Sequence, residues 1–210
     1  MQLAQGHKAV TFPVAGLTFA IILLNVWLHD VLVRLLLVFS LVMLLFILFF
    51  FRDPERQIPD SPGILAPADG KIIETTDSKG YSSIKIMMSL FDVHVTRMPI
   101  DGKILSIKRK SGSFFPMIPF YTKISRNNAR QIILVEGNDH QMKITQISAF
   151  LARRCVCYHD IGTFVPRGSR LGIVRLGSEV DIHFPSNSYQ VKVQVGQTVR
   201  AGETLIATYR

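Results

Sequence analysis

The chain has 210 residues, enough for one domain of ordinary size plus an appendage, and this length excludes a large multidomain assembly. Apolar residues make up 48% and charged residues 19%, which is too apolar for a disordered chain. The net charge of +9 indicates an anionic partner and, taken alone, leaves both a membrane surface and nucleic acid open.

The first 51 residues are almost free of charge. Only Lys8, Asp30 and Arg34 are formally charged there, and residues 12–28 and 35–51 form two uncharged apolar segments of 17 residues each. That length is the lower limit for crossing a hydrocarbon core about 30 Å thick. We expect residues 1–51 to be a membrane anchor built as a transmembrane helical hairpin. The alternative is one long helix from about Val31, with the first segment lying in the interface.

The positive charges beside this anchor predict its orientation. Lys8 precedes the apolar pair, and Arg52 and Arg56 follow it. Because cytoplasmic flanks are enriched in Lys and Arg, we expect the cytoplasmic membrane as the location, with the following domain on the cytoplasmic side.

Residues 52–210 have the pattern of a mainly β domain. Four prolines between positions 54 and 67 disfavour a helix at its start, and eleven short β-rich runs separated by turn residues then indicate a sandwich or barrel. The segments 64–74 and 191–209 are similar to strand-turn-strand elements of biotinyl/lipoyl domains, with Gly196 and Gly202 at turns that need a positive φ. The lysine-bearing tip of such carriers is not recognisable, which disfavours a carrier function.

Three motifs stand out in this domain: APADG at 66–70, MSLFDVHVTRMPIDG at 88–102 and RLGSEVDIHFP at 175–185. Each alone has a purely structural explanation, as a hairpin turn, a strand histidine or a bulge. Together, and in this order, they resemble the phosphatidylserine decarboxylase family, particularly its short, archaeal-type form, over essentially all of residues 52–210.

The resemblance implies a self-cleaving carboxy-lyase. The bond between Gly177 and Ser178 would be cut by the protein itself, leaving a β chain of residues 1–177 and an α chain of residues 178–210. Ser178 would become a pyruvoyl group, a covalently bound pyruvate that forms a Schiff base with the substrate amine and takes up electrons as CO₂ leaves. The product would be phosphatidylethanolamine, and neither a metal nor a diffusible cofactor is implied.

The resemblance also implies roles for three other residues. His94 is expected to carry the proton in decarboxylation and to be a candidate base for self-cleavage, while Asp69 would orient or assist a base. The family's long form has a second histidine where this chain has Arg97, so the identity of the self-cleavage base stays open. Arg97 is a candidate for binding the phosphate or carboxylate of the substrate.

The expected partners are phosphatidylserine in an anionic membrane and the chain's own two fragments, with no nucleic acid; a homo-oligomer is compatible with the sequence. Two alternatives stay open: a decarboxylase of another aminoacyl lipid, and a non-enzymatic membrane adaptor with a lipoyl-like barrel. The apolar run 111–124 either packs over the core or forms a lid that touches the membrane and admits the lipid. In the second case the cations Lys108, Arg109, Lys110 and Lys123 lie beside it for the anionic headgroup.

Overall fold

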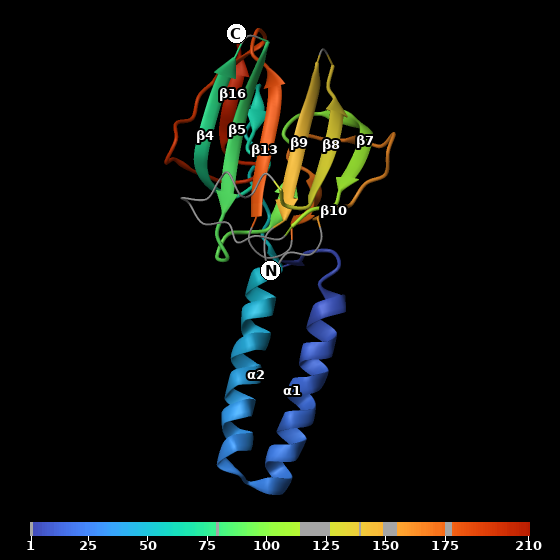
Figure 1. Cartoon of the computed structure of the whole chain (residues 1–210), viewed down its shortest axis with the longest axis vertical. Coiled ribbons are helices and arrows are strands. Elements are labelled where there is room, and N and C mark those ends of the chain that lie inside the picture. Colours follow the sequence, from blue (N-terminus) through green and yellow to red (C-terminus); the bar gives the residue numbers. More distant parts are fainter. Residues whose placement is uncertain (1, 79, 114–126, 139, 149–154, 175–177) are drawn as a thin grey trace. The chain divides into compact units, whose positions relative to one another are not determined.

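The structure is a computed structural model that describes residues 2–78, 80–113, 127–138, 140–148, 155–174 and 178–210 (Figure 1). The chain divides into two compact units, a helical unit from Met1 to Pro54 and a β unit from Glu55 to Arg210. Each unit is described by itself.

The helical unit consists of α1 (Lys8–Leu28) and α2 (Val31–Phe50), which pack against each other. The chain reverses at His29, which has a positive φ of 48°, and at Asp30, whose side chain accepts a hydrogen bond from Leu32 N at 2.7 Å and caps α2. Strands β1 (Gln2–Leu3) and β2 (Arg52–Asp53) pair at the other end of the hairpin. Both helices are long and apolar enough to cross a membrane. The predicted helical hairpin is confirmed.

The β unit contains fourteen strands in its described residues. Their bounds are β3 Ile64–Leu65, β4 Gly70–Ser78, β5 Tyr81–Met88, β6 Val95–Arg97, β7 Gly102–Lys110, β8 Arg130–Glu136, β9 Gln141–Ser148, β10 Cys155–Cys157, β11 Phe164–Val165, β12 Arg170–Val174, β13 Ser178–Pro185, β14 Tyr189–Val191, β15 Thr198–Val199 and β16 Leu205–Tyr209.

These strands form one large sheet and two small ones. The large sheet has the order β11-β7-β8-β9-β13-β5-β4-β15, and the small sheets have the orders β10-β12-β6 and β14-β16-β3. The three sheets share one apolar core, to which β5, β9, β12, β13 and β16 all contribute buried side chains. The mainly β prediction is confirmed; among the described strands the large sheet does not close on itself, so the unit is closer to a sandwich than to a barrel.

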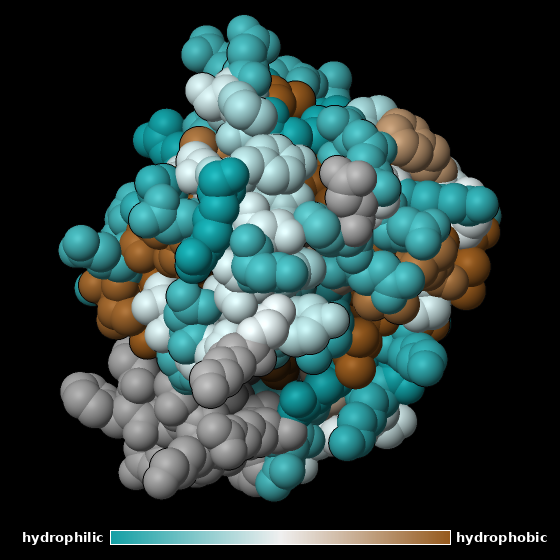
Figure 2. Space-filling view, turned by 90° about the horizontal axis from the view of Figure 1, so that it is seen from above, coloured by the Kyte–Doolittle hydropathy of each residue, from teal (hydrophilic) through white to brown (hydrophobic). Residues whose placement is uncertain are grey.

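The C-terminal segment has the predicted strand-turn-strand form. Gly196 and Gly202 have φ values of 96° and 75°, which side-chain-bearing residues rarely adopt. Gly202 N donates to Ala66 O at 2.9 Å, so the second turn lies against the APADG segment. In the view of Figure 2 the surface is largely hydrophilic and its hydrophobic residues form separate patches.

Candidate active site

The residue expected to react begins the central strand of the large sheet. Ser178 is the first residue of β13, which lies between β5 and β9, and it is paired with Met88 on one side and with Ser148 on the other. Because strand residues alternate between faces, position 178 shares the face of Val180 and Ile182, which are fully buried in the core. Pairing on both sides fixes the backbone at this position. Gly177, the other half of the expected cleavage site, lies outside the described residues.

His94 lies at the same end of the fold as Ser178. Its carbonyl oxygen accepts from Val174 N at 3.1 Å, four residues before Ser178 in the chain. From the other direction, Met88 is paired with Ser178 and is followed six residues later by His94. The His94 side chain is fully buried. His94 is therefore connected both to Val174, by this hydrogen bond, and through six residues of chain to Met88, the strand partner of Ser178.

A hydrogen bond selects the atom of His94 that can act as a base. Nδ1 of His94 lies 2.9 Å from the main-chain oxygen of Asp92. A carbonyl oxygen only accepts, so Nδ1 carries the hydrogen and Nε2 of the neutral ring holds the lone pair. The turn that supplies this carbonyl is itself braced, because Asp92 Oδ2 accepts from both N and Oγ of Ser89 at 2.7 Å.

Asp69 is held by an ion pair with Arg56. Its carboxylate accepts from Arg56 Nη2 at 3.0 and 2.8 Å and from Ala201 N at 2.7 Å. Both side chains of this pair are largely buried, with 6% of Arg56 and 13% of Asp69 exposed. No hydrogen bond joins Asp69 to His94 in the described structure. Through these contacts Asp69 connects the APADG segment to Arg56 at the start of the β unit and to Ala201 in the loop before β16.

Arg97 points away from the face on which Thr96 lies. Thr96 Oγ1 accepts from Gln146 Nε2 at 2.8 Å, and the neighbouring Arg97 is on the opposite side of the strand. Arg97 is buried, its Nη1 donates to Gly168 O at 3.2 Å, and its side-chain carbons lie beside Gly202. The structure therefore does not bring Arg97 together with Ser148 or with the polar residues around it.

An open cavity of about 740 Å³ lies beside Ser148, the residue paired with Ser178. We call it the Ser148 cavity. Its lining comes from the ends of β7, β8 and β9 and from β10, and consists of Arg109, Lys110, Ser111, Gly112, Ala129, Arg130, Gln131, Ser148, Cys155 and Val156. Three of these residues are cationic and none is acidic. The cavity therefore suits an anionic ligand next to Ser148, the strand partner of Ser178.

The sequence predicted the basic residues Arg109 and Lys110 of this cavity, as cations for an anionic headgroup, but not its polar residues Gln131 and Ser148. The hydrogen-bonded pairs Gln131–Gln146 and Gln146–Thr96 join residues 15 and 50 positions apart in the chain. Only the antiparallel register of the strands brings these residues together, and isolated glutamines carry no motif. The sequence indicates these two glutamines only in that each takes an inward-facing strand position of the kind that aliphatic residues otherwise fill.

The pKa values of several titratable groups near Ser178 are shifted, and burial is the main cause. Burial, with the neighbouring Asp181 carboxyl, raises the pKa of Glu179 to about 8, and the pKa of Asp181 is raised as well. Burial, together with Lys143 and Lys85, lowers the pKa of His183 to about 4, so this histidine is neutral at pH 7. Burial raises the pKa of the Cys155 thiol to about 12. No group of three His, Cys, Asp or Glu side chains able to hold a metal occurs in the described residues.

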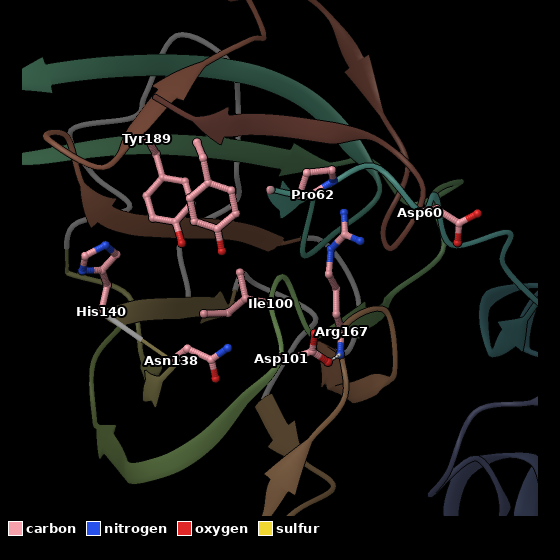
Figure 3. A pocket seen from close by; sticks show the side chains of 11 residues that line it. Asp60, Pro62, Ile100, Asp101, Asn138, His140, Arg167 and Tyr189 are labelled. Carbon is pink, nitrogen blue, oxygen red and sulfur yellow. Dashed lines mark hydrogen bonds between the residues drawn. The ribbon is translucent and has the colours of Figure 1, made fainter.

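A second pocket, of about 260 Å³, belongs to the other end of β13. Tyr189, which follows β13 by four residues, stacks on Tyr209 with ring centroids 4.8 Å apart, and Ile100 and Arg167 face the same space (Figure 3). An eight-residue strand extends about 25 Å, so this pocket is remote from Ser178. It is not part of the candidate active site.

Comparison with known proteins agrees with the arrangement of motifs. Residues 43–207 match the sequence model of the family described as "Phosphatidylserine decarboxylase". A protein of Chlorobium limicola named "Phosphatidylserine decarboxylase proenzyme" is 41% identical over 82% of this chain and 84% of its own length. Proteins of the same name from Chlorobaculum tepidum and Oleidesulfovibrio alaskensis are 42% and 38% identical, over 78% and 93% of this chain and 77% and 91% of their own lengths.

Proposed function

The chain belongs to the phosphatidylserine decarboxylase family, and we propose that it is a carboxy-lyase that converts phosphatidylserine to phosphatidylethanolamine and CO₂. The observation that carries this proposal is the family match over residues 43–207, which includes the Gly177-Ser178 step, on a fold where Ser178 begins the central strand. The alternative of another aminoacyl lipid has no observation in its favour. A non-enzymatic adaptor is disfavoured by the same match.

The proposed first event is self-cleavage. Ser178 Oγ attacks the carbonyl carbon of Gly177, and the peptide bond becomes an ester. Removal of the Ser178 α-proton eliminates that ester, which leaves a carboxylate on Gly177 and a dehydroalanine that hydrolyses to the pyruvoyl group and ammonia. Two features support this step: the relatives are named proenzymes, and a glycine before Ser178 leaves the carbonyl open to attack.

The pyruvoyl group, when formed, supplies a carbonyl for the substrate amine and a sink for the electrons released with CO₂. The position suits such a group because it faces the side of the sheet next to the Ser148 cavity, where no acidic side chain lines the described surface. The chain's own contribution is then to bind the substrate, to exclude water and to move one proton. We assign the proton to Nε2 of His94, which its Nδ1 contact leaves as the basic nitrogen.

Asp69 and Arg97 enter the proposal as positioning residues. Arg97 N donates to Pro67 O at 2.8 Å, so the segment that carries Asp69 lies against β6, which begins directly after His94. The Arg56 ion pair fixes this segment, and Asp69 would thus assist the base indirectly. The Arg97 guanidinium donates through Nη1 to Gly168 O, and this contact holds the side chain beside Gly202.

The two apolar helices are compatible with membrane association. We propose the cytoplasmic membrane, with the β unit on the cytoplasmic side, because Lys8 and Arg52 flank the hairpin. Arg56 contributes less to this positive flank than its place in the sequence suggests, since its side chain is buried in the ion pair with Asp69. The hairpin would keep the enzyme at the bilayer in which its substrate resides.

A direct assay tests this function. Purified full-length protein is incubated with phosphatidylserine in detergent micelles, and phosphatidylethanolamine and CO₂ are measured. We expect both products in equal amounts from the wild type and neither from Ser178→Ala. Decarboxylation by Ser178→Ala would contradict the proposed chemistry, and absence of both products with the wild type would contradict the proposed function.

A further inference from the structure

The inner face of the large sheet changes character toward Ser178. Across the five strands from β5 to β7, one row of paired residues consists of isoleucines, in the order Ile84, Ile182, Ile144, Ile133 and Ile107. The next row toward Ser178 begins with Ile86 and Val180 and then becomes polar, with Gln146, Gln131 and Arg109. The polar half of this row borders the Ser148 cavity, to which Gln131 and Arg109 both belong.

The polar side chains of this row form a chain of hydrogen bonds that ends at Arg109. Arg109 Nε donates to Gln131 Oε1 at 3.3 Å, Gln131 Nε2 donates to Gln146 Oε1 at 3.1 Å, and Gln146 Nε2 donates to Thr96 Oγ1 at 2.8 Å. Gln131, Gln146 and Thr96 are at most 1% exposed, whereas Arg109 reaches solvent. A buried polar chain of this kind costs free energy unless every member is satisfied, and it holds its members in one arrangement.

These hydrogen bonds leave Nη1 and Nη2, the two terminal nitrogens of Arg109, available for a ligand. Its Nε is used by Gln131, and within the described residues Nη1 and Nη2 make no hydrogen bond. A guanidinium presents its donors as a rigid fork that fits two oxygens of a phosphate or carboxylate. Lys110 and Arg130 also line the cavity, but they lie at the alternate strand positions, outside the polar row, and Arg130 Nε donates to Asn128 O at 3.1 Å.

From this geometry we propose that Arg109 is the headgroup-binding residue of the enzyme and that it binds the phosphate of the lipid. This inference rests on the proposed function. The substrate headgroup carries two anions, and the carboxylate must lose its charge as CO₂ forms. A guanidinium on that carboxylate would stabilise the ground state more than the transition state and would slow the reaction. The phosphate keeps its charge throughout, so binding there lowers KM without raising the barrier.

The proposal therefore predicts a specific kinetic pattern. Arg109→Ala removes an interaction that is equal in the ground and transition states, so KM for phosphatidylserine should rise about 10- to 100-fold while kcat stays within about threefold. Arg109→Lys keeps a charge without the fork and should raise KM less. The matched control is Lys108→Ala, which removes one exposed cation from the other face of the same strand and should leave KM unchanged.

The experiment uses full-length processed protein in nonionic micelles at 0.15 M salt, where attraction by general surface charge is weak. Glycerophosphocholine, which has a phosphodiester but neither a carboxylate nor a primary amine, should compete with substrate for the wild type and lose about tenfold or more in potency for Arg109→Ala. L-serine, which has a carboxylate but no phosphate, is tested in the same way. If L-serine competes with substrate in the wild type but not in Arg109→Ala, Arg109 binds the carboxylate and the proposal is overturned.

Other results also overturn it. An unchanged KM for Arg109→Ala, an equal rise for Lys108→Ala, or a loss of kcat at constant KM would each contradict phosphate binding by Arg109. If the Arg109→Ala protein does not cleave itself, the KM of Arg109→Lys is measured instead. A KM equal to that of the wild type for Arg109→Lys would exclude phosphate binding by Arg109. These outcomes differ from failure of the proposed function, in which the wild type itself produces no phosphatidylethanolamine.

Discussion

Nδ1 of His94 lies 2.9 Å from the main-chain oxygen of Asp92, and this contact makes Nε2 the basic nitrogen of the buried ring. The Asp92 side chain is occupied in bracing its own turn through Ser89. The Nδ1 side of the histidine is therefore oriented by a backbone carbonyl. A neutral partner avoids adding a second negative charge next to the substrate carboxylate.

Replacing His94 tests its role as the proton carrier. His94→Ala should lower kcat by about 10²- to 10⁴-fold, the usual contribution of a positioned general acid-base group. The measurement is product formation normalised to the amount of cleaved protein on a denaturing gel. His183→Gln is the matched control, because His183 is neutral at pH 7 and lies on the other face of β13. A His94→Ala protein that cleaves and decarboxylates at the wild-type rate would exclude the assignment.

Asp69→Asn should destabilise the β unit. It removes the charged hydrogen bonds between Asp69 and Arg56 and leaves the buried guanidinium with only the longer contact to Glu203 at 3.6 Å, a change that costs about 1.5–3 kcal/mol. We expect a melting temperature lower by about 5 °C in thermal denaturation of the full-length protein. The control is Glu55→Gln, which removes the ion pair between Glu55 and Arg170. Because the Glu55 side chain is 72% exposed, this change should have little effect on the melting temperature. Equal melting temperatures for Asp69→Asn and the wild type would show that this pair is not structural.

Stability should fall between pH 6.5 and 8 because of Glu179. Its pKa in the folded protein is raised to about 8, so in this range the folded state holds a proton that the unfolded state has lost. The stabilisation is complete below the unfolded pKa near 4.5 and is lost as the pH rises through about 8. The lowered pKa of His183 acts in the opposite direction, but only between about pH 4 and 6.5.

Glu179→Gln should therefore flatten the dependence of melting temperature on pH above 6.5. Asp181, whose pKa is also raised, should retain part of the slope. Glu136→Gln, a change at an exposed strand end, serves as the control and should keep the wild-type slope. A slope for Glu179→Gln as steep as that of the wild type would exclude Glu179 as its source.

The Cys155 thiol should resist alkylation in the folded protein. With its pKa raised to about 12, only about one thiol in 10⁴ is ionised at pH 8, and the thiolate is the reactive form. Mass spectrometry after brief treatment with iodoacetamide should find Cys155 unmodified in native protein and modified after unfolding. Burial also raises the pKa of Cys157, so it should react slowly as well. Rapid native labelling of Cys155 would contradict this account.

The sequence predicted those features that depend on local pattern. Uncharged segments long enough to span a bilayer became α1 and α2, and the turn glycines Gly196 and Gly202 have the positive φ values that their positions required. The partners within the site depend on register instead. Arg56 pairs with Asp69, thirteen positions further along the chain, and Gln146 donates to Thr96, fifty positions away. Such contacts are set by how strands align, and no single segment of sequence encodes that alignment.

The most direct test of the account is the intact mass of the purified protein. Self-cleavage predicts two fragments, residues 1–177 and a 33-residue fragment of residues 178–210 whose first residue has the mass of a pyruvoyl group in place of serine. The Ser178→Ala protein should give one uncleaved chain. A wild-type preparation that decarboxylates phosphatidylserine yet consists only of the intact 210-residue chain would contradict the central claim.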